Sequence, residues 1–251
     1  MNIHQQRQQV TLSVSLNAVR EMREKLGNDL IDLRKLALFA EEAGADQISL
    51  SVQGATWSSI EADVQFLSRN SIGSFELEVA PADVMLDQVA TLSVRQICLV
   101  SSSPMKGAVD VVDLVAQCLG ADAAVKKLHA CGKQVAAYVL PDVAQIAAAA
   151  QLGISAVRLN CSSLCEAKDD AQRARQLTQI ASVATECVRR GLSVSVGGSL
   201  RLQDIALIAH LEDVVQVHVD DAVMAQALLC GWEVAVRATK ALLVKSRLSA
   251  R

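Results

Sequence analysis

The sequence predicts an α/β fold, a (β/α)8 TIM barrel with extra helices after strand four and at the C-terminus. The first observation behind this prediction is that eight strand-like segments, each followed by helical spacing, succeed one another along 251 residues. That length is typical of such a barrel. The second is strict polar alternation within several strands, whereas strands of an open parallel sheet are covered on both faces and read as continuous apolar runs. A closed barrel explains both, because its helices cover one face and its lumen can be polar.

The expected strands begin near residues 10, 46, 74, 95, 134, 155, 192 and 213. The first connecting helix is expected within 30–43, and Gly44 follows where a left-handed C-terminal cap belongs. Gly132, Gly153 and Gly191 stand in the same position before strands five, six and seven. Two further helical segments are expected, at 107–119 and at 232–246.

Composition narrows the function classes. We expect one domain spanning 1–251, with a polar N-terminal tail at 1–9. The net charge of -3 and the 2% aromatic content argue against nucleic-acid binding. Neither a signal peptide nor a membrane span is expected, and the seven scattered cysteines suit reduced thiols in a cytoplasmic protein. Cys161 and Cys165 have no second ligand pair at a suitable spacing, so we expect no metal.

The alternation turns one set of polar residues toward the lumen. These residues are Ser15, Asn17, Ser49, Ser51, Gln53, Glu76, Glu78, Arg158, Asn160, Ser193, Ser195, Gln216, His218 and Asp220. Since barrel chemistry sits at the C-terminal ends of the strands, the members nearest those ends are the candidate site.

Glu78 is the first candidate for general acid or base catalysis. An inward carboxyl near a strand end can be desolvated, which raises its pKa toward neutrality. Arg158 also faces inward, and a buried guanidinium needs a partner. An ion pair of Arg158 with Glu76 or Glu78 is therefore the alternative interpretation, and the sequence leaves both open. His218 is the one histidine expected to face the lumen, and it is the second catalytic candidate.

A phosphate site is suggested after strand seven by Gly197, Gly198 and Ser199. They join the strand to a helix, with free backbone amides and Ser199 as a candidate N-cap. Turn geometry explains the glycines equally well. Asp220 and Asp221 at the end of strand eight oppose a phosphate there, since each carboxylate repels it by about 1 kcal/mol or more at partly screened distances.

Four segments of the chain resemble pyridoxine 5'-phosphate synthase, the barrel enzyme that closes the vitamin B6 ring. They are AEEAGAD at 40–46, LEVAPADVML at 77–86, CLV at 98–100 and EAKDDAQRARQLTQIASVAT at 166–185, and the resemblance runs from Val10 to about Leu243. It implies a barrel with additional helices and a homo-octamer built from dimers. It also implies condensation of 1-deoxyxylulose 5-phosphate with an amino-oxopropyl phosphate, without metal or organic cofactor.

The functional positions of that family are mostly changed here. Glu78 falls on the catalytic glutamate and Arg23 on an arginine of the first loop. An Asn, Asp and His after strand one become Ser15, Asn17 and Ala18, and a histidine and arginines after strand two become Ser51, Gln53, Thr56 and Trp57. After strand four, the family's Pro-Glu and Thr-Glu-Gly-Gly segments are replaced by Ser101, Ser102 and the run from Lys106 to Val112. In strand six, Glu and His become Arg158 and Asn160. In strand seven, Gly-His-Gly becomes Gly197, Gly198 and Ser199, and in strand eight Gly-His becomes Asp220 and Asp221.

The changes predict that the family reaction is weak or lost. Each missing histidine removes a proton-transfer group worth about 10²–10⁴-fold in rate, and each missing cation removes about 1.5–3 kcal/mol of charge-assisted hydrogen bonding.

The first hypothesis is therefore a diverged homologue that keeps the barrel and the homo-oligomer and binds a small molecule, phosphorylated or not. The second is an active synthase that uses Glu78, His218 and Arg158 in new roles. The third is a non-catalytic partner that co-assembles with an authentic synthase. Whether the chain is an enzyme stays open. Trp57 is expected to pack over the mouth of the barrel or in a subunit contact.

Overall fold

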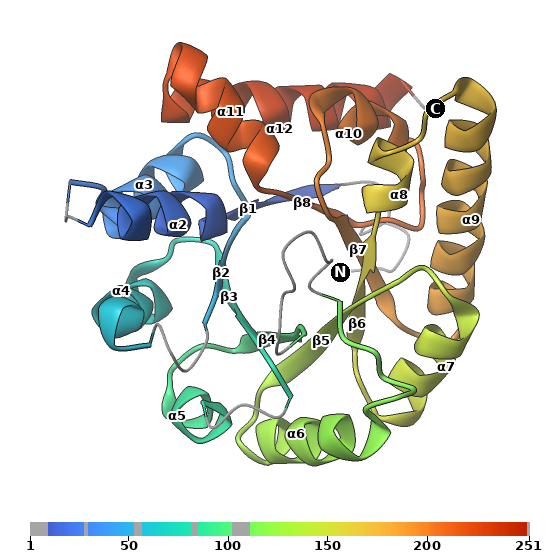
Figure 1. The fold of residues 1–251 in the computed structure, drawn as a ribbon, viewed down its shortest axis with the longest axis horizontal. Helices are drawn as coiled ribbons and strands as arrows, with labels where there is room; N and C mark the ends of the chain where they lie inside the picture. The colour runs from blue at the N-terminus through green and yellow to red at the C-terminus, as the bar shows by residue number, and fades with distance from the viewer. Residues whose placement is uncertain (1–9, 28–29, 53–56, 82–84, 102–110, 250–251) are drawn as a thin grey trace.

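The computed structural model describes residues 10–27, 30–52, 57–81, 85–101 and 111–249. Eight parallel strands form a closed barrel in sequence order, with β1 paired to β8 (Figure 1). The strands are β1 Thr11–Ser15, β2 Gln47–Ser51, β3 Ser74–Val79, β4 Gln96–Leu99, β5 Gln134–Val139, β6 Ala156–Asn160, β7 Ser193–Gly197 and β8 Gln216–Val219. The predicted barrel is confirmed, and seven of the eight predicted strand starts lie within about one residue of the observed ones.

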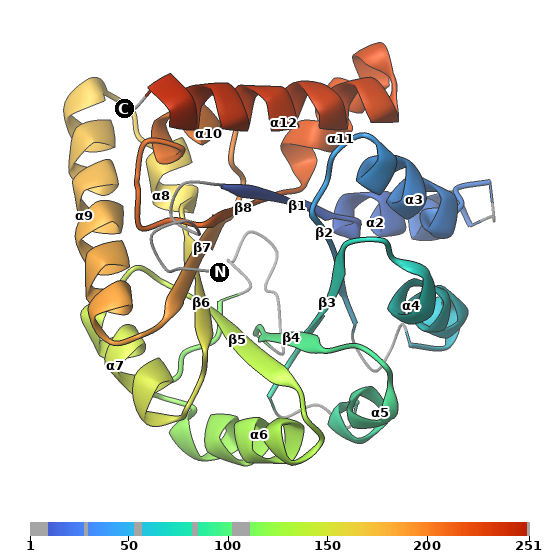
Figure 2. The same ribbon diagram turned by 180° about the vertical axis from the view of Figure 1, so that it is seen from behind.

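Helices surround the barrel on every side (Figures 1 and 2). They are α2 Asn17–Leu26, α3 Leu33–Glu42, α4 Trp57–Asn70, α5 Leu86–Thr91, α6 Cys118–Ala130, α7 Val143–Gln151, α8 Ser162–Cys165, α9 Asp170–Arg189, α10 Leu202–Ile208, α11 Asp221–Cys230 and α12 Trp232–Ser249. The expected C-terminal helix is present as α12. Of the segment expected to be helical at 107–119, residues 111–113 have no regular secondary structure, residues 114–117 form a turn, and helix begins only at Cys118. Across the described ranges, no helix has both the length and the apolar character needed to cross a bilayer.

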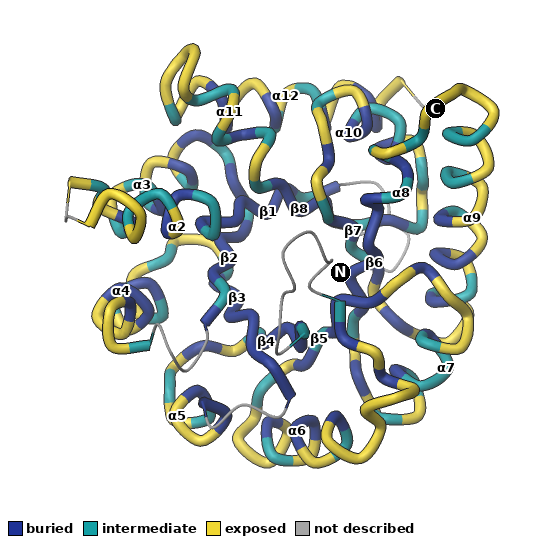
Figure 3. The backbone as a smooth tube through the Cα atoms, viewed as in Figure 1, coloured by how far each residue is buried: buried dark blue, intermediate teal, exposed yellow. Residues whose placement is uncertain are grey.

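The hydrophobic core lies between the barrel and the helices. Leu12, Val14, Ile48 and Leu50 on the first two strands are fully buried there, and Figure 3 shows burial concentrated along the strands with exposed outer helix faces. The residues that alternate with them on these strands, Ser13, Ser15, Ser49 and Ser51, face the lumen. This arrangement accounts for the polar alternation, since only the outward side chains of each strand pack on helices.

Glycine caps return the chain into the barrel as predicted. Gly44, Gly132, Gly153 and Gly191 have φ angles of 111°, 71°, 74° and 79°. At these left-handed positions a side chain is disfavoured, so glycine ends each helix at low cost. Each capped helix leads back to the start of the next strand. All eight strands therefore run in the same direction, and their C-terminal ends share one mouth.

Candidate functional site

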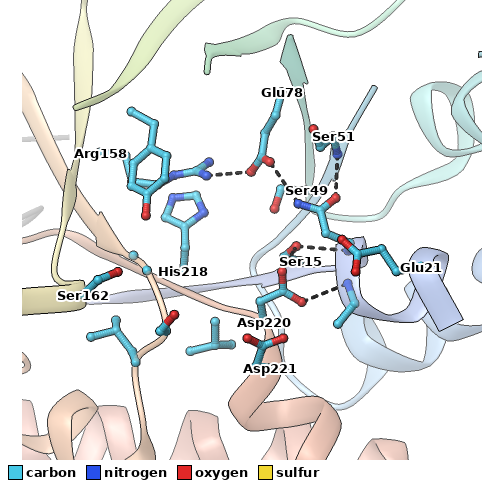
Figure 4. A pocket seen from close by; sticks show the side chains of 18 of the residues that line it. Ser15, Glu21, Ser49, Ser51, Glu78, Arg158, Ser162, His218, Asp220 and Asp221 are labelled. Atoms are coloured by element: carbon cyan, nitrogen blue, oxygen red, sulfur yellow. Dashed lines mark hydrogen bonds and ion pairs between the residues drawn. The ribbon is translucent and has the colours of Figure 1, made fainter. Parts of the chain in front are cut away.

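A cavity of about 630 Å³ opens at the C-terminal ends of the strands. It is lined by Ser15, Asn17, Ala18, Arg20, Glu21, Ser49, Ser51, Glu78, Tyr138, Arg158, Ser162, Glu166, Gly197, Gly198, Ser199, Leu200, His218, Val219, Asp220 and Asp221 (Figure 4). We call it the mouth cavity. The structure thus brings together most of the candidate residues from β1, β2, β3, β6, β7 and β8, as expected for a barrel site.

An ion-pair cluster forms the inner wall of the mouth cavity. The Arg158 guanidinium donates through Nη1 to Glu78 Oε1 at 2.6 Å and through Nη2 to Glu76. All three side chains are buried, and the guanidinium carbon lies 5.5 Å from the centre of the Tyr138 ring, in cation–π geometry. The predicted ion pair is confirmed, and it joins Arg158 to both carboxylates. Burial raises the pKa of Glu76 to about 7, against the opposing effect of Arg158.

Glu78 is held on both sides of its carboxylate. Its second oxygen, Oε2, accepts a hydrogen bond from Asn17 Nδ2 at 3.1 Å, and Asn17 Oδ1 accepts the backbone N–H of Ser51 at 2.7 Å. Asn17 is the first residue of α2, so its side chain reaches back over the strand ends. A network of this kind fixes the orientation of the carboxylate at the edge of the cavity.

Asp220 is a half-buried carboxyl with neutral hydrogen-bond partners. It accepts hydrogen bonds from the Ser15 hydroxyl at 3.0 Å and from the Ala18 backbone N–H at 3.2 Å. Burial raises the pKa of Asp220 to about 7, and the neighbouring Asp221 adds to the rise. Near neutral pH this group can therefore either donate or accept a proton.

His218 stays neutral in the lumen. Burial lowers its pKa well below the ordinary value, and the positive charge of Arg158 lowers it further. Its Nδ1 is buried without a hydrogen-bond partner among the described residues. A neutral imidazole on the cavity wall can donate from one nitrogen and accept at the other.

The segment after β7 is shaped by close contacts. A Cβ on Gly198 would lie 2.5 Å from Asn160 Nδ2 and 2.6 Å from the Tyr138 hydroxyl, so only glycine fits. Ser199 has a φ of 49°, and the N-cap of the seven-residue α10 is Arg201. The prediction that Ser199 caps this helix was wrong, because the helix begins later than the glycines suggested.

Several predicted residues lie outside the cavity lining. Arg23 on α2 pairs with Asp63 on α4 at 2.8 Å. Trp57 is partly buried against the main hydrophobic core and is not among the residues that line the mouth cavity. Asn160 stands behind Gly198, where it donates to the Tyr138 hydroxyl and accepts the Ser162 backbone N–H. Gln53, Thr56, Ser102 and residues 106–110 fall outside the described ranges.

Among the polar and charged lining residues, sequence reasoning missed four, namely Arg20, Glu21, Tyr138 and Glu166, whereas Ser162 was expected at the rim and lies there. Strand alternation could have found Tyr138, which follows Gln134 and Ala136 on the inward side of β5. The others lie on or beside short helices that start at the ends of β1 and β6, where strand alternation no longer applies.

Comparisons with known proteins identify relatives of the whole barrel. The family model described as pyridoxal phosphate biosynthesis protein PdxJ matches residues 12–245. Among solved structures, a 4-hydroxy-2-oxoglutarate aldolase/2-deydro-3-deoxyphosphogluconate aldolase from TTHB1 is similar with a TM-score of 0.62 and 18% identity, over 97% of this chain and 99% of that one. Phosphoribosylantranilate isomerase from Thermotoga maritima gives 0.57 and 14%, over 96% and 99%. At such low identities these structural likenesses speak for the fold alone.

Proposed function

We propose, on the premise that this chain belongs to the pyridoxal phosphate biosynthesis protein PdxJ family, that it is a diverged member whose ring-closing catalysis is weak or lost and whose mouth cavity binds a small molecule. Membership places the protein in the setting of vitamin B6 biosynthesis. The proposal adds to membership that catalysis is weak or lost, that the cavity binds a small molecule, and that the chain forms a homo-oligomer.

The state of Glu78 carries the proposal. Its two oxygens already accept hydrogen bonds from Arg158 and Asn17, at 2.6 Å and 3.1 Å. Each oxygen keeps a further lone pair, but these contacts fix the orientation of the carboxylate, and a general base must lie within hydrogen-bond reach of the proton that it abstracts. The position that matches the family's catalytic glutamate is therefore tied into the barrel wall.

The remaining lining supports the same conclusion. The two cations on the described lining, Arg20 and Arg158, are each paired with a carboxylate, Arg20 with Glu24 at 2.8 Å. His218 is neutral and deep in the lumen. Free cationic side chains strengthen phosphate binding through charge-assisted hydrogen bonds, and the described part of this mouth offers carboxylates in their place.

Purified protein tests the proposal directly. Incubated with 1-deoxyxylulose 5-phosphate and the amino-oxopropyl phosphate, it should form pyridoxine 5'-phosphate no faster than a blank, as followed by chromatography. An authentic synthase run in parallel validates the assay. Product formed at a substantial rate, and abolished by Glu78→Gln, would show that the family reaction survives and would overturn the proposal.

One observation favours a second candidate, an active synthase with a rearranged site. Asp220 has a pKa of about 7 and lines the mouth cavity, which suits a proton-transfer group. In the same assay this candidate predicts product formation that Asp220→Asn lowers more strongly than Glu78→Gln does.

Under either candidate we expect a homo-oligomer in the cytoplasm, and size-exclusion chromatography with light scattering measures the assembly. The idea of a non-catalytic partner predicts co-purification with an authentic synthase.

A further inference from the structure

We propose that the mouth cavity binds a small polar molecule that carries an ammonium group and no phosphate. This inference rests on the proposed function, because it names the ligand class of the same site. It depends on three features of the cavity: an excess of carboxylates, their grouping at one side, and unpartnered neutral groups at the other.

The described lining carries more negative than positive charge. Its carboxylates are Glu21, Glu78, Glu166, Asp220 and Asp221, and its cations are Arg20 and Arg158. Both guanidinium groups are already paired, Arg20 with Glu24 outside the lining and Arg158 with Glu76 and Glu78. Within the described ranges, none of Glu21, Glu166, Asp220 and Asp221 forms an ion pair with a protein cation. The uncompensated charge attracts a cation and repels a phosphate.

Three of these carboxylates lie on one side of the cavity. Figure 4 shows Glu21, Asp220 and Asp221 around Ser15. Asp220 is fixed there by the Ser15 hydroxyl and the Ala18 amide, at 3.0 and 3.2 Å. An ammonium group has three N–H donors and no acceptor, so it matches a group of carboxylate oxygens. Its charge also relieves the repulsion between the adjacent carboxyls of Asp220 and Asp221.

Neutral polar side chains without partners line the inner part of the same cavity. Ser49 is fully buried and His218 is 6% exposed, and Ser49 Oγ and His218 Nδ1 have no hydrogen-bond partner among the described residues. Buried polar groups are normally satisfied, so unpartnered ones on a cavity wall point to a ligand or to water. Hydroxyl or ring-nitrogen groups of a ligand would satisfy them. The occupant is thus a molecule with an ammonium group at the outer, acidic side and neutral polar groups inside.

Three vitamin B6 compounds form a matched set of probes for this proposal. Pyridoxamine carries an aminomethyl group, pyridoxine has a hydroxymethyl group in its place, and pyridoxamine 5'-phosphate adds a phosphate to the amine. An alkyl amine is protonated at neutral pH. By isothermal titration calorimetry at pH 7.5, pyridoxamine should bind at least about tenfold more tightly than either of the others, as expected for one additional charge-assisted hydrogen bond or one repulsion avoided.

Variants then test whether the carboxylates provide the preference. Glu21 and Asp221 are exposed at the mouth, so Glu21→Gln and Asp221→Asn should fold normally. Each should lower the affinity for pyridoxamine at least about threefold while the affinity for pyridoxine stays unchanged, as expected for loss of a partly screened charge pair. Asp122→Asn on α6, which removes an exposed carboxylate paired with Lys126, is the control and should change neither affinity.

Three results would overturn the proposal: equal or tighter binding of pyridoxamine 5'-phosphate, equal binding of pyridoxamine and pyridoxine, or no binding of any probe. These outcomes are independent of the synthase assay. Tight binding of the phosphate compound without product formation would remove this inference and leave the proposed function standing. Product formation together with a preference for the amine would do the reverse.

Discussion

The two ends of the barrel lumen are both polar, but they differ in charge and size. The mouth cavity holds about 630 Å³ and is lined by several carboxylates. A basal pocket of about 110 Å³ at the opposite end has a polar lining of amides and hydroxyls, from Gln47, Gln96, Gln134, Ser155, Ser193, Ser195 and Gln216, with Glu76 as its one carboxyl among the described residues. At this end Gln47 donates to Gln96, and the Ser195 hydroxyl donates to a backbone carbonyl at 3.3 Å.

The difference shows what polar alternation means in this chain. It marks the lumen along its whole length, whereas among the described lining residues the carboxylates without a protein cation lie at the mouth, which is also the larger of the two cavities. The cluster of Arg158, Glu76 and Glu78 lies between the two regions, since Glu76 borders the basal pocket and Glu78 the mouth cavity. The described polar side chains at the base are mostly neutral, with Gln47 bonded to Gln96 and the Ser155 and Ser195 hydroxyls bonded to backbone carbonyls, whereas those at the mouth leave charge uncompensated.

Removing the cation between the two regions should have the largest effect. Arg158→Met leaves Glu76 and Glu78 buried and unpaired, which should lower the free energy of unfolding by about 3–5 kcal/mol in urea denaturation. Adding Glu76→Gln and Glu78→Gln should recover part of that loss. The exposed Arg189, paired with Glu186 at 2.7 Å, provides the control, and Arg189→Met should cost less than about 1 kcal/mol. A loss for Arg158→Met as small as the control would show that the cluster does not stabilise the barrel.

The stability difference between Asp220→Asn and the wild type should depend on pH, because the variant removes an uncompensated charge at the mouth. The pKa of Asp220 is raised from 3.8 to about 7 in the folded protein, so the wild-type protein loses stability as the pH rises through that range. Asp221 and Glu78 are the charged groups that contribute to the rise. The variant should match the wild type at pH 4 and exceed it at pH 8 by about 1–4 kcal/mol. The measurement is thermal and urea unfolding across that range, with Asp122→Asn as a control. If the stability difference between Asp220→Asn and the wild type did not change with pH, the raised pKa of Asp220 would be contradicted.

Gly198→Ala tests how closely the wall of the mouth is packed. The new Cβ would meet Asn160 and Tyr138 at 2.5 and 2.6 Å, at a φ of 96°, and should cost about 1–3 kcal/mol by thermal unfolding. Gly231 has a φ of 88° and no atom within 4 Å of the position that its Cβ would take, so Gly231→Ala isolates the backbone strain. Equal losses for the two variants would mean that the close approach of Asn160 and Tyr138 to Gly198 contributes nothing.

The basal pocket should tolerate the loss of its polarity. Replacing both Gln47 and Gln96 by Leu removes a hydrogen bond together with its two partners, which is often nearly neutral, so the free energy of unfolding should change by less than about 1.5 kcal/mol. Pyridoxamine binding at the mouth should not change. A loss of binding by this double variant would mean that the two regions act as one site.

Strand alternation predicted the lumen well because each inward position follows from a period of two. It predicted that Ser15, Glu78, Arg158, His218 and Asp220 face the lumen, and it foresaw the ion pair of Arg158 with an inward glutamate. It could not place Arg23, whose orientation depends on how α2 packs against Asp63 of α4. Nor could it find Arg20 and Glu21, because their positions depend on where the helix after β1 begins and how it lies over the mouth.

Local pattern in the chain was enough for the closed barrel, the order of its elements, the glycine caps and the family resemblance, since each depends on periodicity or on a few neighbouring residues. The charge balance of the site depended on folding. Two questions depended on distances between strands that are far apart in the chain. One is whether Arg158 serves a ligand or neutralises Glu76 and Glu78, and the other is whether Asp220 has a cationic partner. The contacts that answer them join Arg158 to Glu78 and Ser15 to Asp220. Electrostatic energies vary with those distances and with burial, so only the tertiary structure decides them.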